Sequence, residues 1–177
     1  VINNSAGAID PYVLERVNEA EAIWFAGGNQ YNYVSYFKDN AMETALNTFI
    51  NVKRVVMEGT RAERAILGVV YFVQEKEKVP NPKDFSIQYH NRRSLGYNDF
   101  LEIPLLENVI TDTHYDDPDR RGRHTAFLAR FAKDNNLRPF GIACNEYTAV
   151  CINSNGRAFV YGDYPNYEEH AFFIQSN

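Results

Sequence analysis

Residues 54–70 combine an apolar run, a tight turn and a second apolar run, a pattern that restricts the chain to folds in which strands and helices alternate. Residues 54–57 predict a strand, the turn lies at 59–63, and 65–70 predict the helix that follows. Residues 22–26 form another short apolar run, bounded by two glycines, and predict a buried parallel strand. Because strand, turn and helix recur in this order, we expect an α/β fold, a three-layer sandwich with a mainly parallel sheet.

The turn at 59–63 has the sequence context of a nucleophile elbow, in which a tight turn between two small residues exposes one side chain above the sheet. Gly59 occupies the first small position, but Glu63 stands at the second and Arg61 at the nucleophile position. A guanidinium stays protonated and offers no lone pair for attack, so Arg61 cannot replace Ser, Cys or Thr. The segment therefore predicts a hydrolase scaffold whose reacting atom is missing.

Helices are predicted from caps and from apolar spacing. Asp10 and Pro11 begin a helix over 11–20. One helix or a pair of helices fills 30–53, and another covers 125–135. We expect the inward-facing residues of these last two regions to be Ala45, Leu46, Phe49, Ile50, Phe127, Leu128 and Phe131.

Short apolar runs in the C-terminal part predict strands, and Asn155-Gly156 predicts a two-residue hairpin turn between two of them. The polar residues 74–100 predict a long surface excursion that borders the site. The length of 177 residues fits a single domain, and because the chain opens without Met we expect a fragment or a processed form. The predicted strands are 105–112, 140–144, 149–152, 158–161 and 171–174.

Composition excludes several classes of function. A net charge of −5 and a pI near 5.4 argue against nucleic-acid binding, since the basic residues at 120–123 are flanked by aspartates. No run of about 18 apolar residues predicts a membrane span. Cys144 and Cys151 are expected to be buried free thiols, because neither metal-ligand spacing nor a disulfide framework is present. We expect no metal and no cofactor, and the compartment stays open.

Asp112-Thr113-His114 closes an apolar strand, where open α/β sheets place their ligand crevice. His114 is therefore a candidate general base. The alternative is a loop histidine bonded to Asp116 or Asp117. The other histidines are expected on the surface or in helices: His90, His124 and His170.

Gly27 and Gly28 follow the strand at 22–26 directly, so their N–H groups can approach a ligand closely, with the side-chain amides of Asn29 and Gln30 beside them. This turn is a candidate oxyanion hole or substrate clamp. The alternative is an ordinary strand-to-helix turn. A similar polar pair, at 145–146, carries a weaker signal, and capping of a strand end accounts for it equally well.

The ordered set of motifs resembles the family of cyanophycinase and the aspartyl dipeptidase known as dipeptidase E, serine hydrolases on a class I glutamine amidotransferase-like fold. The resemblance covers nearly the whole chain, and it implies that further strand and helix units precede residue 1, so that the chain is the C-terminal two thirds of a longer protein. The matching segments are Gly27-Gly28-Asn29-Gln30, Gly59-Thr60-Arg61-Ala62-Glu63, Asp112-Thr113-His114-Tyr115, Arg120-Arg121-Gly122-Arg123 and Gly141-Ile142-Ala143-Cys144-Asn145-Glu146-Tyr147-Thr148-Ala149.

The resemblance implies roles for individual residues. His114 matches the catalytic histidine, Gly28 and the turn after it match the oxyanion and substrate region, and Arg61 occupies the position of the nucleophilic serine. Asp112 falls in the substrate-binding part of the motif. The third catalytic residue is expected to be an acidic group after the elbow helix, with Glu75 and Glu77 as the candidates.

These observations leave two classes of function open, besides a purely structural subunit. The first is a pseudoenzyme that has lost hydrolysis and binds a peptide or a small acidic ligand, such as an aspartyl peptide. The second is an active hydrolase of aspartyl or isoaspartyl peptides that uses another nucleophile. A homo-oligomer is compatible with either.

Overall fold

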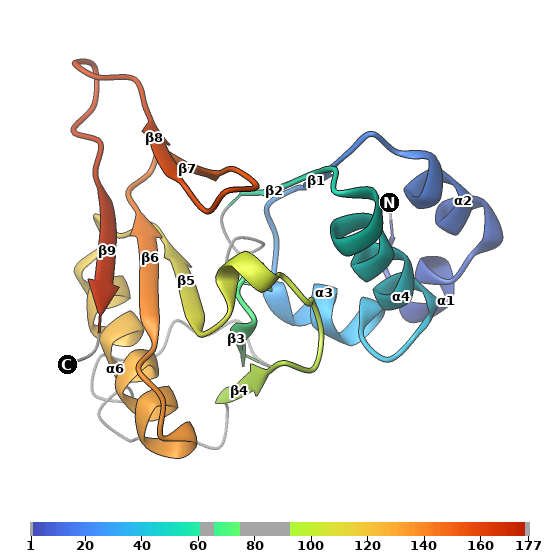
Figure 1. Ribbon diagram of the computed structural model, residues 1–177, viewed down its shortest axis with the longest axis horizontal. Coiled ribbons are helices and arrows are strands. Elements are labelled where there is room, and N and C mark those ends of the chain that lie inside the picture. The colour runs from blue at the N-terminus through green and yellow to red at the C-terminus, as the bar shows by residue number, and fades with distance from the viewer. Residues whose placement is uncertain (1, 61–65, 75–92, 176–177) are drawn as a thin grey trace.

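The computed structural model describes residues 2–60, 66–74 and 93–175. Within these ranges the chain is an α/β protein, with helices grouped around a small parallel strand pair in the N-terminal part and a five-stranded sheet in the C-terminal part (Figure 1). Arg61 and Glu63, together with Glu75, Glu77 and His90, lie outside the described residues.

The N-terminal helices begin at side-chain caps, as the sequence predicts. Asp10 Oδ1 accepts a bond from the N–H of Tyr12 at 2.9 Å, and Asn29 and Asn40 cap their helices in the same way. The helix over 11–20 and the pair over 30–53 are confirmed, and Leu46 and Phe49 are buried. The elements are α1 Ser5–Ala8, α2 Pro11–Glu19, α3 Gln30–Phe37, α4 Ala41–Thr48 and the π-helical turn η1 Phe49–Lys53.

Strand β1 (Ala22–Phe25) pairs in parallel with β2 (Val56–Gly59), which confirms two predicted strands and their direction. The expectation that β1 is buried is wrong, because only Phe25 is buried and the side chain of Trp24 is 62% exposed. This strand pair therefore presents one face that is open to solvent.

The main sheet has the strand order β4-β3-β5-β6-β9 and is mixed. Its three central strands are parallel, and each edge strand runs antiparallel to its neighbour, so the mainly parallel sheet of the prediction is limited to the centre. Helix α6 (Pro118–Asn135) packs on β5 and β6. The strands are β3 Val70–Gln74, β4 Arg93–Tyr97, β5 Val109–Thr113, β6 Phe140–Cys144 and β9 Ala171–Gln175.

Two expectations around the first apolar turn are wrong. Residues 70–74 form strand β3 and 67–69 are not helical, so the helix predicted over 65–70 is absent from its described part. A Cβ on Gly68 would lie 2.6 Å from the carbonyl oxygen of Val109, so this stretch passes directly against a neighbouring backbone. The predicted surface excursion over 74–100 also contains an ordered element, strand β4.

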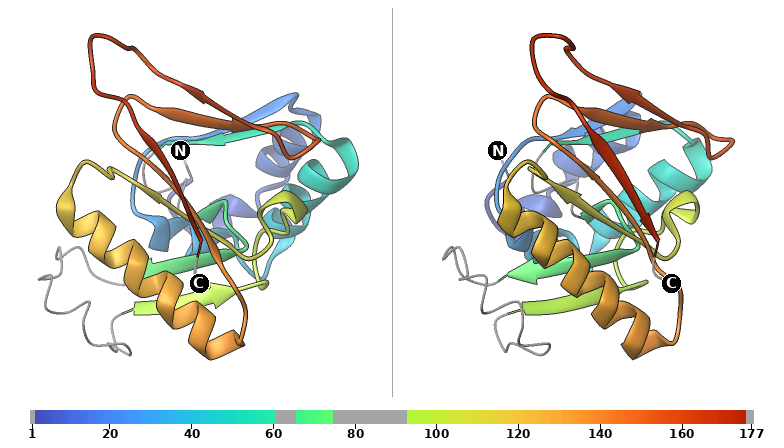
Figure 2. Two further views of the ribbon diagram at one scale, coloured as in Figure 1. Left: turned by 60° about the vertical axis from the view of Figure 1, so that its left-hand side comes forward. Right: turned by 90° about the vertical axis from the view of Figure 1, so that its left-hand side faces the viewer.

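The β7–β8 hairpin leaves the main sheet and extends toward the β1–β2 pair in each view (Figure 2). Strands β7 (Ala149–Ile152) and β8 (Ala158–Tyr161) are antiparallel, as predicted. The predicted two-residue turn is wrong: a backbone bond from the N–H of Asn153 to Arg157 encloses three residues, and Gly156 adopts φ 75°. A residue in the left-handed region at this place is typical of three-residue hairpin loops.

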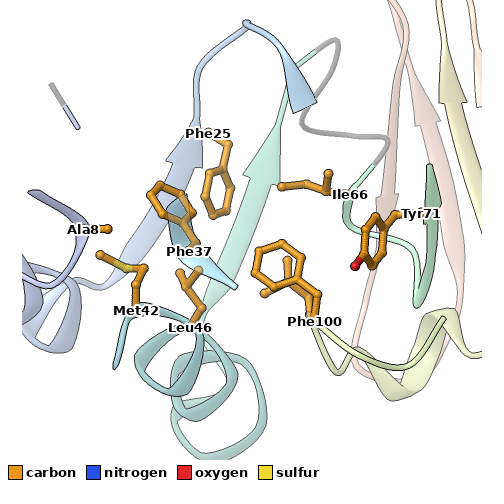
Figure 3. Packing of buried hydrophobic residues seen from close by; sticks show 9 residues of the cluster. Ala8, Phe25, Phe37, Met42, Leu46, Ile66, Tyr71 and Phe100 are labelled. Carbon is orange, nitrogen blue, oxygen red and sulfur yellow. The ribbon is translucent and has the colours of Figure 1, made fainter. Parts of the chain in front are cut away.

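Two apolar clusters lie on opposite faces of β3. Val70 packs with Ile110 and with residues of α6, whereas the next residue, Tyr71, faces the N-terminal helices. Tyr71, Ile66 and Phe100 belong to the same buried cluster as Phe37 and Leu46 (Figure 3). The N-terminal helices and the main sheet therefore share one core, which fixes the β1–β2 pair beside the carboxyl ends of β5 and β6.

Candidate functional site

His114 stands immediately after β5 and bonds to a glutamate that follows the neighbouring strand. Its Nδ1 lies 2.6 Å from Oε1 of Glu146, which follows β6. Because β5 and β6 are parallel and register Thr113 opposite Cys144, the residues after each strand meet at the same edge. The alternative of a bond from the ring to Asp116 or Asp117 is not what the structure shows.

The backbone around this pair is held in a defined conformation. His114 has φ 55°, in the left-handed region that a non-glycine residue rarely adopts. The N–H of Tyr115 donates to the carbonyl of Cys144 at 3.1 Å, and the N–H of Asp117 donates to the carbonyl of His114 at 3.0 Å. These bonds fix the backbone on both sides of His114, and the ring itself is held by its contact with Glu146.

Glu146 is the functional residue that the sequence analysis underrated. Its N–H donates to Asp116 Oδ1 at 3.2 Å, so the segment is tied to the loop after β5. One signal in the sequence could have identified Glu146. Polar residues follow two apolar runs, 105–112 and 140–144, and both runs were predicted as strands of a mainly parallel sheet. The candidates Glu75 and Glu77 lie outside the described residues, and in the described part Glu146 is the acidic partner of His114.

A carboxylate bonded to one ring nitrogen fixes the tautomer and orientation of a histidine and stabilises its protonated form. This is the arrangement of a general base with an orienting acid. Within the described part of the chain, the His114 ring bonds to no hydroxyl and to no thiol. The base and its acid are thus in place, whereas the described residues provide no nucleophile in contact with the ring.

The pair opens onto a cavity of about 530 Å³. Its walls come from the β1–β2 pair, the ends of β5 and β6, and strand β7 of the hairpin. The charged and titratable groups among the described lining residues are Glu58, His114, Glu146, Tyr147 and Cys151. No lysine or arginine belongs to that described lining, so its fixed charge is negative.

The cavity also contains hydroxyl and thiol groups. Thr60, Thr113, Thr148 and Cys151 line it, and Cys151 is exposed. The expectation of two buried thiols holds only for Cys144, whose Sγ donates to the carbonyl of Thr148 at 3.1 Å. Both thiols are free, as predicted.

Asp112 does not line the cavity but lies beneath it, 1% exposed. Its carboxylate accepts a bond from Arg123 Nε at 2.9 Å and a second bond from Nη2 of the same guanidinium. This buried pair joins β5 to α6. The pair holds the strand end that carries His114, and the predicted substrate-binding role of Asp112 stays a prediction.

The turn with Gly28, Asn29 and Gln30 lies at the carboxyl end of β1, next to the end of β2. Asn29 Oδ1 accepts the N–H of Tyr31 at 3.0 Å, which is the helix-capping alternative. None of the three lines the cavity as bounded by the described residues. Their predicted role as an oxyanion or substrate region stays a prediction.

His124 is a core residue of α6 rather than a surface histidine. Its Nε2 lies 3.0 Å from the carbonyl oxygen of Ile110, its Nδ1 lies 3.3 Å from the hydroxyl of Tyr115, and burial lowers its pKa. In the described ranges, no group of three or more His, Cys, Asp or Glu residues could hold a metal ion. Nor does any helix there have the length and apolar character needed to cross a bilayer.

No protein-family model matches this sequence, and no curated protein matches it. Among solved structures, a peptidase from an acI-B1 Actinobacterium has a similar fold, with a TM-score of 0.59 and 17% sequence identity over 98% of this chain. The chain spans 66% of the length of that peptidase. The protein therefore has an α/β fold of the kind found in a peptidase.

Proposed function

We propose that this chain is a domain of the cyanophycinase and dipeptidase E type, on a class I glutamine amidotransferase-like fold, whose hydrolytic activity is impaired. The observation that carries the proposal is the 2.6 Å pair between His114 and Glu146 at the cavity. It supplies the base and the orienting acid of a serine peptidase. The fold shared with a peptidase supports the same scaffold.

The impairment rests on Arg61, which occupies the expected serine position in the sequence. The strand before it in the sequence, β2, ends at Gly59, and the N–H of Thr60 donates to the carbonyl of Phe25, so the described chain stays on the β1–β2 pair up to residue 60. Loss of the nucleophile from a triad leaves only the catalysis due to binding and oxyanion donors. In this proposal the cavity keeps a peptide or small acidic ligand, with Arg61 as a counter-charge.

The proposal is tested with purified protein and α-aspartyl and β-aspartyl dipeptides. We expect no turnover by the natural chain above that of His114→Ala, which removes the base. The double variant Arg61→Ser with Glu63→Gly restores the elbow sequence, and it should gain hydrolysis that depends on His114 and Glu146. Turnover by the natural chain at ordinary enzymatic rates refutes the impaired state.

An active hydrolase with another nucleophile is the second candidate, because Thr60 and the exposed Cys151 line the same cavity as His114. Two covalent probes separate the two proposals: a serine-directed fluorophosphonate and the thiol reagent iodoacetamide. Labelling that requires His114 and abolishes peptide turnover supports the second candidate. Absence of a fluorophosphonate adduct, together with thiol labelling that is indifferent to His114→Ala, rules it out.

A further inference from the structure

The cavity has two exposed aromatic residues that the peptidase-like function leaves unused. Trp24 on β1 and Tyr147, which follows Glu146, both line it, and their side chains are 62% and 63% exposed. Large exposed aromatic rings inside a cavity have apolar surface that a ligand can cover. They therefore point to a ligand that binds to the faces of these rings.

Tyr147 is held rigidly in this place. It has φ 58°, a conformation that is strained for a bulky side chain and that persists only where its surroundings impose it. Its ring stacks on that of Tyr167, with centroids 4.1 Å apart and planes 17° from parallel. One face of Tyr147 is thus covered by protein, and the ring forms a preorganised platform.

Glu58 adds a negative charge beside Trp24. In the parallel register Trp24 lies directly beside Glu58, so both side chains leave the same face of the strand pair, and both line the cavity. Among the described residues Glu58 has no ion pair and no hydrogen bond, whereas Glu146 is engaged by His114. The described cavity therefore combines two aromatic rings with one uncommitted carboxylate.

We propose that the wall formed by Trp24, Tyr147 and Glu58 binds a quaternary ammonium group. The electron-rich faces of Trp and Tyr attract cations, and a carboxylate adds to this attraction. A quaternary ammonium carries no N–H donors, so it needs no further acceptors in the cavity. A primary ammonium is more strongly hydrated and loses that hydration on entry, whereas a quaternary ammonium loses less.

Trp24 is the chain's single tryptophan, so its fluorescence reports directly on this wall. Choline is titrated against 3,3-dimethyl-1-butanol, its neutral isostere, and against 2-aminoethanol, its primary-amine analogue, at constant ionic strength. We expect choline to bind roughly tenfold more tightly than the neutral isostere and more tightly than the primary amine. Equal affinity for the neutral compound, or tighter binding of the primary amine, overturns the proposal.

Variants locate the effect. Tyr147→Leu and Glu58→Gln should each weaken choline binding by about threefold and leave the neutral isostere unchanged. The matched controls are Tyr12→Leu, an exposed tyrosine of α2, and Glu21→Gln, an exposed carboxylate just before β1, and neither lines the cavity. If the controls weaken binding as much as the cavity variants, choline binds elsewhere and the assignment is wrong. None of these ligands has a peptide bond, so the result is independent of the hydrolysis assays.

Discussion

The buried pair between Asp112 and Arg123 gives a direct test of how the site is held. The side chains are 1% and 9% exposed, and Arg123 Nε donates to Asp112 Oδ2 at 2.9 Å beside a second bond from Nη2. In the variant Arg123→Met, the Asp112 carboxylate keeps one hydrogen bond, which its Oδ1 accepts from the N–H of Thr113 at 2.7 Å. Removing one partner of a buried pair costs about 3–5 kcal/mol, and the remaining N–H places this case near the lower end, at about 3 kcal/mol.

For a chain of this size each kcal/mol lowers the melting temperature by about 2–4 °C, so the expected fall is roughly 6–12 °C. Urea unfolding followed by far-ultraviolet circular dichroism measures the free energy itself. Arg130→Met on the same helix is the matched control, because its pair with Asp134 at 3.3 Å lies nearer the surface and contributes about 0.5 kcal/mol or less. Asp112→Asn combined with Arg123→Met leaves no buried charge and should recover part of the loss. Equal destabilisation by Arg123→Met and Arg130→Met would refute the reasoning.

Further predictions concern the core and the thiols. Burial lowers the pKa of His124 from its usual value near 6.5. The unfolded chain therefore takes up the proton first, and the free energy of unfolding decreases as the pH falls through about 6.5. The urea midpoint of His124→Gln should depend less on pH in this range than that of the natural chain. Gly141→Ala places a Cβ 2.7 Å from Cε1 of His124 and should cost about 1–3 kcal/mol in urea unfolding, whereas Gly122→Ala meets nothing within 4 Å and should not destabilise α6. A thiol reagent should label Cys151 in the native protein and reach Cys144 only on unfolding, as mass spectrometry of the two peptides will show.

Helix caps and strand composition predicted most elements correctly, but an apolar run without polar interruptions does not distinguish a helix from a buried strand. Residues 66–73 are such a run; of the helix predicted over 65–70, residues 67–69 are not helical and Val70 begins β3. Tertiary contacts decide between the two: β3 is paired on both sides, and its consecutive residues Val70 and Tyr71 pack into two different cores. Neither the pairing nor the second core is visible from local spacing.

The candidate site shows the same division. His114 was predicted because it follows an apolar strand, a property that can be recognised locally. Its partner was not, since Glu146 lies 32 positions further along the chain and becomes a neighbour only when β5 and β6 pair. Asp112 was predicted as a substrate contact from its place in the motif, but the long side chain of Arg123 reaches it first.

The supports of the pair between His114 and Glu146 explain how such a scaffold could lose its nucleophile and keep its base. The backbone bonds that orient the pair come from β5, β6 and the loop after β5, and the buried pair beneath it ties β5 to α6. None of these contacts comes from the β1–β2 pair, whose second strand leads to position 61. The described contacts that support His114 are therefore independent of the β1–β2 pair. On this reasoning the base and its acid persist for as long as the main sheet does, and their presence by itself is no evidence that hydrolysis occurs.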